Sequence, residues 1–157
     1  KQCFSTVSLA AMTSKTRTRI ALTVILAVVF GTAGYWFSLK PDREFIGRVQ
    51  QEIGQGVNEL DLSKLMPGPW ETVCNIHGYD GPTYIEKYKK TYPPAAQAQD
   101  GAWGLTFINA DGSYTSVAGS TADGFSFNFG CLPKNFAKLA RKSGSDKLWV
   151  AKRKNGS

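Results

Sequence analysis

The chain has 157 residues, of which 42% are hydrophobic and 20% charged, and its formal net charge is +7. This length allows one domain of ordinary size plus an appendage. Four Trp, six Tyr and nine Phe residues supply material for a hydrophobic core, which argues against a disordered chain. Three cysteines exclude a disulfide-dense miniprotein, and sixteen glycines without a fixed period exclude a collagen-like chain.

Near the N-terminus, residues 20–39 form an uninterrupted run of twenty uncharged residues, IALTVILAVVFGTAGYWFSL. A helix of this length spans about 30 Å, the thickness of a bilayer's hydrocarbon core. Basic residues precede the run, and the aromatic residues 35–37 end it, where rings favour the headgroup region. The pattern predicts an uncleaved transmembrane signal anchor; a cleaved signal sequence and a buried core helix are the alternatives.

The segment before the anchor, residues 1–19, is predicted to be a cytoplasmic tail. Residues 1–11 precede Met12 and resemble sequence upstream of a natural start. Basic residues are nearly balanced across residues 20–39, but those on the N-terminal side cluster against it on a short tail, whereas a long domain is translocated largely regardless of its charge. We therefore expect a single-pass protein of the bacterial cytoplasmic membrane whose C-terminal domain is extracytoplasmic.

The segment after the anchor, residues 40–66, is predicted to be an amphipathic stalk helix. Apolar residues recur every fourth position from Phe45 to Val57, and we expect the helix to fray near Gly54. The sequence Met66-Pro67-Gly68-Pro69 ends helices, and it sets the predicted start of a main domain at residues 67–157.

Within that domain, alternating apolar residues predict strands and helical spacings predict helices. A capping-box spacing begins one helix, and a proline begins the other. The predicted strands are residues 70–77, 103–109, 113–118, 125–130 and 147–152, and the predicted helices are residues 84–92 and 133–142. Strands at hairpin spacing with segregated helices predict the α+β class: an N-terminal transmembrane helix, then a small domain with an antiparallel sheet and two or three helices.

Two cysteines of the domain are candidates for a disulfide. Cys74 shares the apolar face of a predicted strand with Trp70 and Ile76, and Cys131 continues the alternation of three phenylalanines. Core-facing cysteines in an exported domain predict a Cys74–Cys131 bond, with two buried thiols as the alternative. A metal or catalytic pair of Cys74 with His77 is not favoured, because residues three apart on a strand point to opposite faces.

Three tyrosines and four basic residues are the candidate contact residues. Tyr84, Tyr88 and Tyr92 fall on one side of the predicted helix 84–92, either as a platform for a sugar or peptide or as core packing. From residue 132 onward there are eight basic residues and one acidic residue, whereas residues 40–131 carry seven basic and eleven acidic residues. The candidates for contact with an anionic surface, on the predicted helix 133–142, are Lys134, Lys138, Arg141 and Lys142. A solvated helix face is the alternative.

No nucleotide-binding, nucleophile-elbow or zinc-ligand pattern is present in the sequence, so we predict neither cofactor nor metal, and an enzyme is not favoured. The expected function is a membrane-anchored binding or accessory module of the bacterial cell envelope. Its expected partner is an envelope protein or an anionic surface, not a nucleic acid. The alternatives are an inhibitor or immunity-type protein that inserts an exposed, mobile loop such as residues 95–101 into a partner, and a small envelope hydrolase with an unrecognised carboxylate site.

Overall fold

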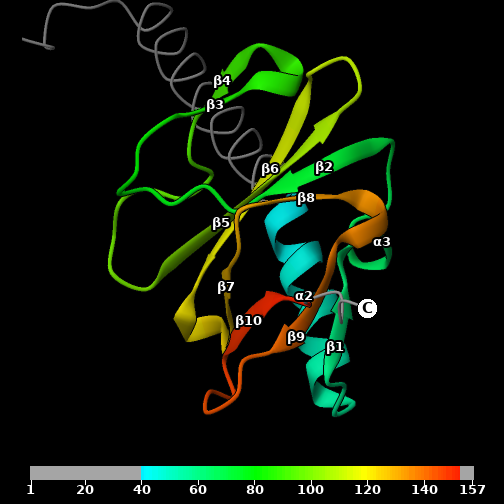
Figure 1. Ribbon diagram of the computed structural model, residues 1–157. Coiled ribbons are helices and arrows are strands. Elements are labelled where there is room, and N and C mark those ends of the chain that lie inside the picture. Colours follow the sequence, from blue (N-terminus) through cyan, green and yellow to red (C-terminus); the bar gives the residue numbers. More distant parts are fainter. Residues whose placement is uncertain (1–39, 153–157) are drawn as a thin grey trace, which may run out of the picture. The chain divides into compact units, whose positions relative to one another are not determined.

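The computed structural model describes residues 40–152 (Figure 1). The predicted tail at residues 1–19 and anchor at residues 20–39 lie outside the described residues, as do residues 153–157. Within residues 40–152, no helix combines the length and apolar character that crossing a bilayer requires. The described chain is a small α+β domain with two α-helices and mainly antiparallel sheets.

The first helix, α2 (Lys40–Gly54), ends at the predicted glycine, because Gly56 takes a φ of +76° that favours glycine. This helix is not a separate stalk. Phe45 and Val49 are almost fully buried in the main core, and the compact unit of the chain begins at Pro41. The helix and the described residues after 67 therefore share one core, because the apolar side of the helix is covered by the sheets that follow it.

One four-stranded sheet has the order β1-β9-β10-β7. Its strands are β1 (Glu59–Asp61), β7 (Ser126–Asn128), β9 (Lys138–Arg141) and β10 (Leu148–Ala151). Its pairs are antiparallel except β10–β7, which is parallel. The short helix α3 (Leu62–Leu65) follows β1, and the Asp61 carboxylate caps it by accepting the Ser63 N–H at 3.0 Å.

The second four-stranded sheet has the order β6-β5-β2-β8 and is antiparallel throughout. Its strands are β2 (Trp70–Cys74), β5 (Ala102–Asn109), β6 (Tyr114–Ser120) and β8 (Cys131–Pro133). The predicted hairpin is confirmed as β5 and β6, which are joined by a turn in which Gly112 has a φ of +77°. The 3₁₀ turn η3 (Thr121–Asp123) follows β6.

The predicted helix at residues 84–92 is wrong. The segment is a hairpin of β3 (Thr83–Ile85) and β4 (Lys90–Tyr92), joined by the 3₁₀ turn η2 (Glu86–Tyr88) and by Lys89 with a φ of +47°. β-Branched residues flank the tyrosines, and the hairpin covers one face of the second sheet, which a spacing argument does not reveal.

The predicted helix at residues 133–142 is also wrong. Only the 3₁₀ turn η4 (Lys134–Phe136) is helical, and β9 follows it. Because β9 lies between β1 and β10, its backbone is paired on both sides, and this pairing overrides a helical propensity worth only a few tenths of a kcal/mol per residue.

The main core lies between α2 and the two sheets. It includes Phe45 from the helix, Leu139 and Trp149 from the first sheet, and Leu105 and Phe107 from the second. The buried phenylalanines at 125, 127 and 129, predicted as one side of a strand, belong to it. A smaller cluster lies on the opposite face of the second sheet, beneath the β3–β4 hairpin, and contains Cys74, Ile76, Tyr92 and Ile108.

Candidate functional site

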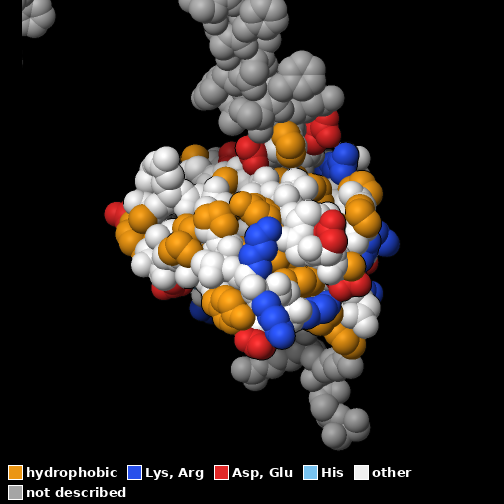
Figure 2. All heavy atoms as spheres, turned by 90° about the horizontal axis from the view of Figure 1, so that it is seen from above, with side chains coloured by type: hydrophobic (Ala, Val, Ile, Leu, Met, Phe, Trp, Pro, Cys, Tyr) orange, Lys and Arg blue, Asp and Glu red, His pale blue; other side chains and the backbone are white. Residues whose placement is uncertain are grey.

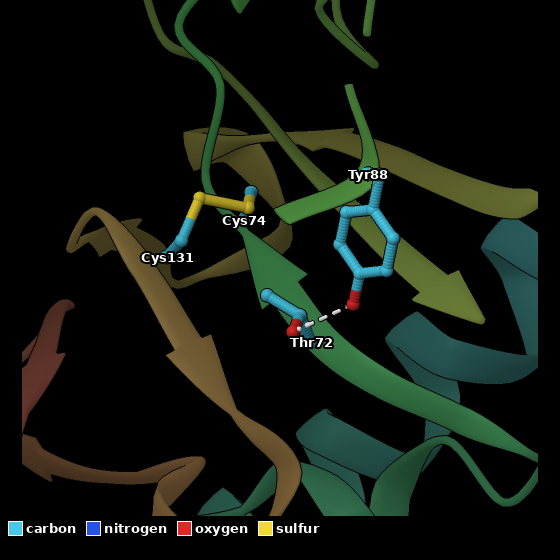
Figure 3. The surroundings of a disulfide bond; sticks show 4 residues. All are labelled: Thr72, Cys74, Tyr88 and Cys131. Atoms are coloured by element: carbon cyan, nitrogen blue, oxygen red, sulfur yellow. Dashed lines mark hydrogen bonds between the residues drawn. A yellow bond between two sulfur atoms is a disulfide. The ribbon is translucent and has the colours of Figure 1, made fainter. Parts of the chain in front are cut away.

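A disulfide joins Cys74 of β2 to Cys131 of β8, as the sequence predicts (Figure 3). The two residues are directly opposite each other across the strand pair, with Cα atoms 4.1 Å apart and sulfur atoms 2.01 Å apart. Cys74 is fully buried, whereas Cys131 is exposed. The bond ties the three-residue edge strand β8 to the centre of the sheet, and it removes Cys74 as a thiol ligand or nucleophile beside His77.

The predicted pairing of Cys74 with Cys131 is confirmed, but Cys74 does not lie on the predicted face of its strand, which was the face of Trp70. The register of β2 against β5 shifts between Trp70 and Thr72, so the alternation of β2 is interrupted there. Trp70 and Val73 consequently face the main core, while Cys74 faces the smaller cluster under the hairpin. Cys131 likewise points away from the phenylalanines that precede it.

The predicted tyrosine platform is not formed. On β3, Tyr84 points away from the sheet and is 56% exposed, whereas Tyr92 is fully buried. Tyr88 donates its hydroxyl proton to Thr72 Oγ1 at 2.9 Å, beside the disulfide (Figure 3). Tyr88 and Tyr92 meet edge to face with ring centres 6.1 Å apart, so two of the three rings serve packing.

A residue outside the prediction, Tyr114 of β6, completes the aromatic cluster. Its ring centre lies 5.4 Å from that of Tyr92, and Lys90 Nζ lies 5.6 Å from both rings. Lys90 Nζ and the Tyr92 hydroxyl both donate to the Gly112 carbonyl, at 3.2 and 3.1 Å. Burial raises the pKa of Tyr92, so it remains a neutral donor. The Lys90 ammonium group thus occupies the space over the Tyr92 and Tyr114 rings, and the cluster fixes the hairpin against the β5–β6 turn.

The four predicted anionic-contact residues do not share a helix face, because the helix is absent. Lys134 donates to the Gly68 carbonyl at 2.5 Å and lies over the Trp70 ring. Lys138 lies 3.8 Å from the Glu59 carboxylate.

The other two cations lie at the end of β9. Arg141 stacks its guanidinium 5.4 Å from the Trp149 ring centre, and Lys142 is exposed. Seen from the side of the β3–β4 hairpin, Figure 2 shows Lys and Arg side chains interspersed with hydrophobic and acidic ones. Three of the four predicted contact residues are therefore engaged within the domain.

The loop at residues 95–101, predicted to be mobile, is held at several points along its length. A Cβ atom on Gly104 would lie 2.7 Å from the Ala96 nitrogen, and one on Gly78 would lie 2.6 Å from the Ala98 nitrogen, so the loop backbone lies directly on these glycines. The Tyr79 hydroxyl donates to the Asp100 carboxylate at 2.9 Å. The loop backbone is consequently fixed at Ala96 and Ala98, while the side chains of residues 97–101 stay exposed.

Asn75 is a buried residue that the sequence did not single out. Its side-chain amide donates to the Gly104 carbonyl at 2.8 Å, and its side-chain oxygen accepts the Phe129 N–H at 3.4 Å. It thereby connects β2, β5 and the segment before β8 just beyond the disulfide. No spacing in the sequence identifies such a residue, because its partners are backbone groups 29 and 54 positions away.

Between residues 40 and 152, no group of three or more His, Cys, Asp or Glu side chains is placed to hold a metal ion. The chain matches no protein-family model, and neither the curated proteins nor the solved structures contain a match.

Proposed function

We propose that this chain is a membrane-anchored, extracytoplasmic binding or accessory protein of the bacterial cell envelope, with an envelope protein as its partner. The Cys74–Cys131 bond is the observation that carries the proposal. Disulfides persist in oxidising compartments such as the periplasm and are rare in the cytosol. The uncharged run at residues 20–39 supplies the anchor in this proposal.

The geometry of the described surface supports binding more than catalysis. Of the residues that the sequence offered, Tyr88 and Lys134 are held by hydrogen bonds within the domain, and Lys138 and Arg141 by a carboxylate and a ring, so this part of the surface is preorganised. The carboxyl of Asp42 has its pKa raised chiefly by burial, but its oxygen is engaged by the Ala118 N–H at 2.9 Å. Such fixed surfaces bind partners without first having to be ordered.

The inhibitor-type alternative is favoured by one specific observation, the fixed loop at residues 95–101. A loop whose backbone lies against Gly78 and Gly104 presents its exposed side chains in one conformation, and such preorganisation lowers the entropic cost of inserting it into a partner's cleft. If this alternative holds, replacing exposed Gln97 and Gln99 with Ala weakens capture of the partner, while exposed Ser143→Ala, on a different turn, leaves it unchanged.

The test of the main proposal combines topology with thiol state. An alkaline phosphatase fused after residue 157 should be active, and a cytoplasmic fluorescent reporter at the same place should be dark. In intact cells, with Cys3 replaced by Ser, an alkylating reagent should label neither Cys74 nor Cys131 until a reductant is added. Cys131→Ser is the matched control, because it leaves Cys74 as a thiol that becomes labelled on denaturation. An inactive phosphatase together with free thiols in the wild type would place the domain in the cytoplasm and refute the proposal.

A further inference from the structure

β6 is an open edge of the second sheet (yellow in Figure 1). It has seven residues, whereas each of the other strands that end a sheet in the described chain has three. It pairs with β5 over its whole length without a register shift. A long, regular edge presents a row of unpaired N–H and C=O groups that can pair with another strand.

The hydrogen bonds show which backbone groups of β6 face outward. Asn109 N–H donates to the Ser113 carbonyl, so the alternation of an antiparallel pair turns the N–H groups of Tyr114, Ser116, Ala118 and Ser120 away from β5. Asp42 accepts from Ala118 at 2.9 Å, and Asp123 accepts from Ser120 at 2.7 Å. Within residues 40–152, no acceptor meets the outward N–H groups of Tyr114 and Ser116.

The end of this edge at residues 114–116 lacks the usual protection. Residues 113–122 contain no charged residue and no proline, although lysines, prolines and bulges ordinarily prevent edge strands from pairing. When a strand pairs with a copy of itself across a two-fold axis, a charged residue on the axis would face the same charge on the other copy. A neutral strand avoids this repulsion, and this favours a second copy of the chain as the occupant.

We propose that two copies of this chain pair antiparallel through β6, with the two-fold axis at Thr115. In this register Tyr114 of each copy lies opposite Ser116 of the other, and each such pair exchanges two backbone hydrogen bonds. The four groups used on each copy are the N–H and C=O groups of these two residues. The bond from Ala118 to Asp42 stays intact, because Ala118 lies beyond the paired residues.

The register fixes the geometry at the axis. Thr115 meets Thr115 of the second copy as a non-hydrogen-bonded pair, in which Cα atoms lie about 4.5 Å apart. Cysteines can form a disulfide across that separation, and Cys74 and Cys131 do so here at 4.1 Å. Tyr114 is held by its ring contact with Tyr92, so this end of the edge is already ordered. The pairing requires neither the membrane placement nor the partner of the proposed function, and its failure would leave both untouched.

The first test is cross-linking of the full chain in a mild detergent, with Cys3 replaced by Ser. Under mild oxidation, Thr115→Cys should yield a covalent dimer at least tenfold more abundant than that of Ser143→Cys. Ser143 is the matched control, because it is also exposed but lies in the turn between β9 and β10. Equal cross-linking of the two variants would overturn the proposal. This is also the result expected if β6 binds a strand of a different protein instead of a second copy.

The second test is the mass of the particle by light scattering after gel filtration. The wild type should have twice the protein mass of one chain. Ser116→Pro should be monomeric, because proline removes an outward N–H while leaving the bonds to β5 in place. Ser116→Ala, which loses only the side-chain contact to Thr106 at 3.3 Å, should remain a dimer. A folded Ser116→Pro variant that is still dimeric would overturn the proposal. If this variant does not fold, the cross-linking result decides.

Discussion

Loss of the disulfide is the perturbation whose magnitude follows most directly from the structure. Cys74 and Cys131 are 57 residues apart, and closing a loop of that length lowers the entropy of the unfolded chain enough to stabilise the fold by about 4 kcal/mol. Cys131→Ser removes the bond at its exposed end, so it should lower the free energy of unfolding by about this amount. Cys74→Ala should add about 1 kcal/mol, because it also removes a buried sulfur atom from the smaller cluster.

The double variant distinguishes a bond from two independent thiols. If the bond is the common cause, Cys74→Ala combined with Cys131→Ser should cost no more than Cys74→Ala alone. If the two cysteines were independent thiols, the changes in the free energy of unfolding from the two substitutions would add. Cys3→Ser is the control, because Cys3 takes no part in the bond and its replacement should leave the unfolding transition unchanged.

The assay is urea unfolding of the full chain in a mild detergent, followed by tryptophan fluorescence. Three tryptophans report on the domain core, Trp70, Trp103 and Trp149, and all are buried. With m about 1.5–2 kcal/mol/M, a loss of about 4 kcal/mol moves the midpoint down by about 2–3 M. A shift below about 0.5 M with an unchanged m value would refute the loop-entropy reasoning.

Three further predictions concern the core, the fixed loop and pH. Phe45→Ala should lower the free energy of unfolding by about 3–5 kcal/mol, measured by the same urea transition, because the ring is buried among aromatic neighbours; a cost below about 1 kcal/mol would contradict the burial. Gly104→Ala should accelerate proteolysis within residues 95–101, whereas Gly130→Ala, with open space at its Cβ, should not; equal cleavage rates would show that the loop is not held there. Burial raises the pKa of Asp42, so the stability that it contributes is fully present below pH 3.8 and is lost as pH rises through the folded-state pKa. Between pH 3 and pH 6, the urea midpoint of Asp42→Asn should therefore rise relative to that of the wild type. A difference between the two midpoints that does not change with pH would contradict this.

The elements set by local patterns were predictable from the sequence. The hairpin of β5 and β6 follows from alternation on both sides of Asp111-Gly112, and α2 follows from its apolar spacing and stops at Gly54. The strict alternation of the phenylalanines at 125, 127 and 129 likewise gives their burial. In each case the sequence pattern and the structure that it predicts involve only neighbouring residues, so distant partners need not be known.

The elements set by distant partners were not predictable. Residues 133–142 carry a helical spacing, but the segment becomes β9 because β1 and β10 pair with it on both sides. The disulfide was inferred from a shared apolar face, although the register shift after Trp70 places Cys74 on the other face. That inference reached the correct pair because neighbouring strands bring the two cysteines together on either face.

Two cations of the basic third of the chain, residues 132–157, meet a carboxylate from its acidic part. β9 lies beside β1, so Glu59 from the acidic part of the chain meets Lys138 and also Lys152. The pKa of Glu59 is lowered, chiefly by its hydrogen bond from Lys152, as expected for a carboxylate between two ammonium groups.

Two further cations of the basic third, Lys142 and Lys147, are exposed beside the turn between β9 and β10, with Asp146 also on this turn. At about 1 kcal/mol for each cation near an anionic membrane, and with the acidic group opposing them, this turn supplies about 1–2 kcal/mol. That energy orients a domain already tethered to a surface but does not hold a free one there. A patch of three or four cooperating cations, as the sequence implied, therefore requires residues beyond this turn, and Lys134, Lys138 and Arg141 are already engaged with the domain's own carbonyl, carboxylate and ring.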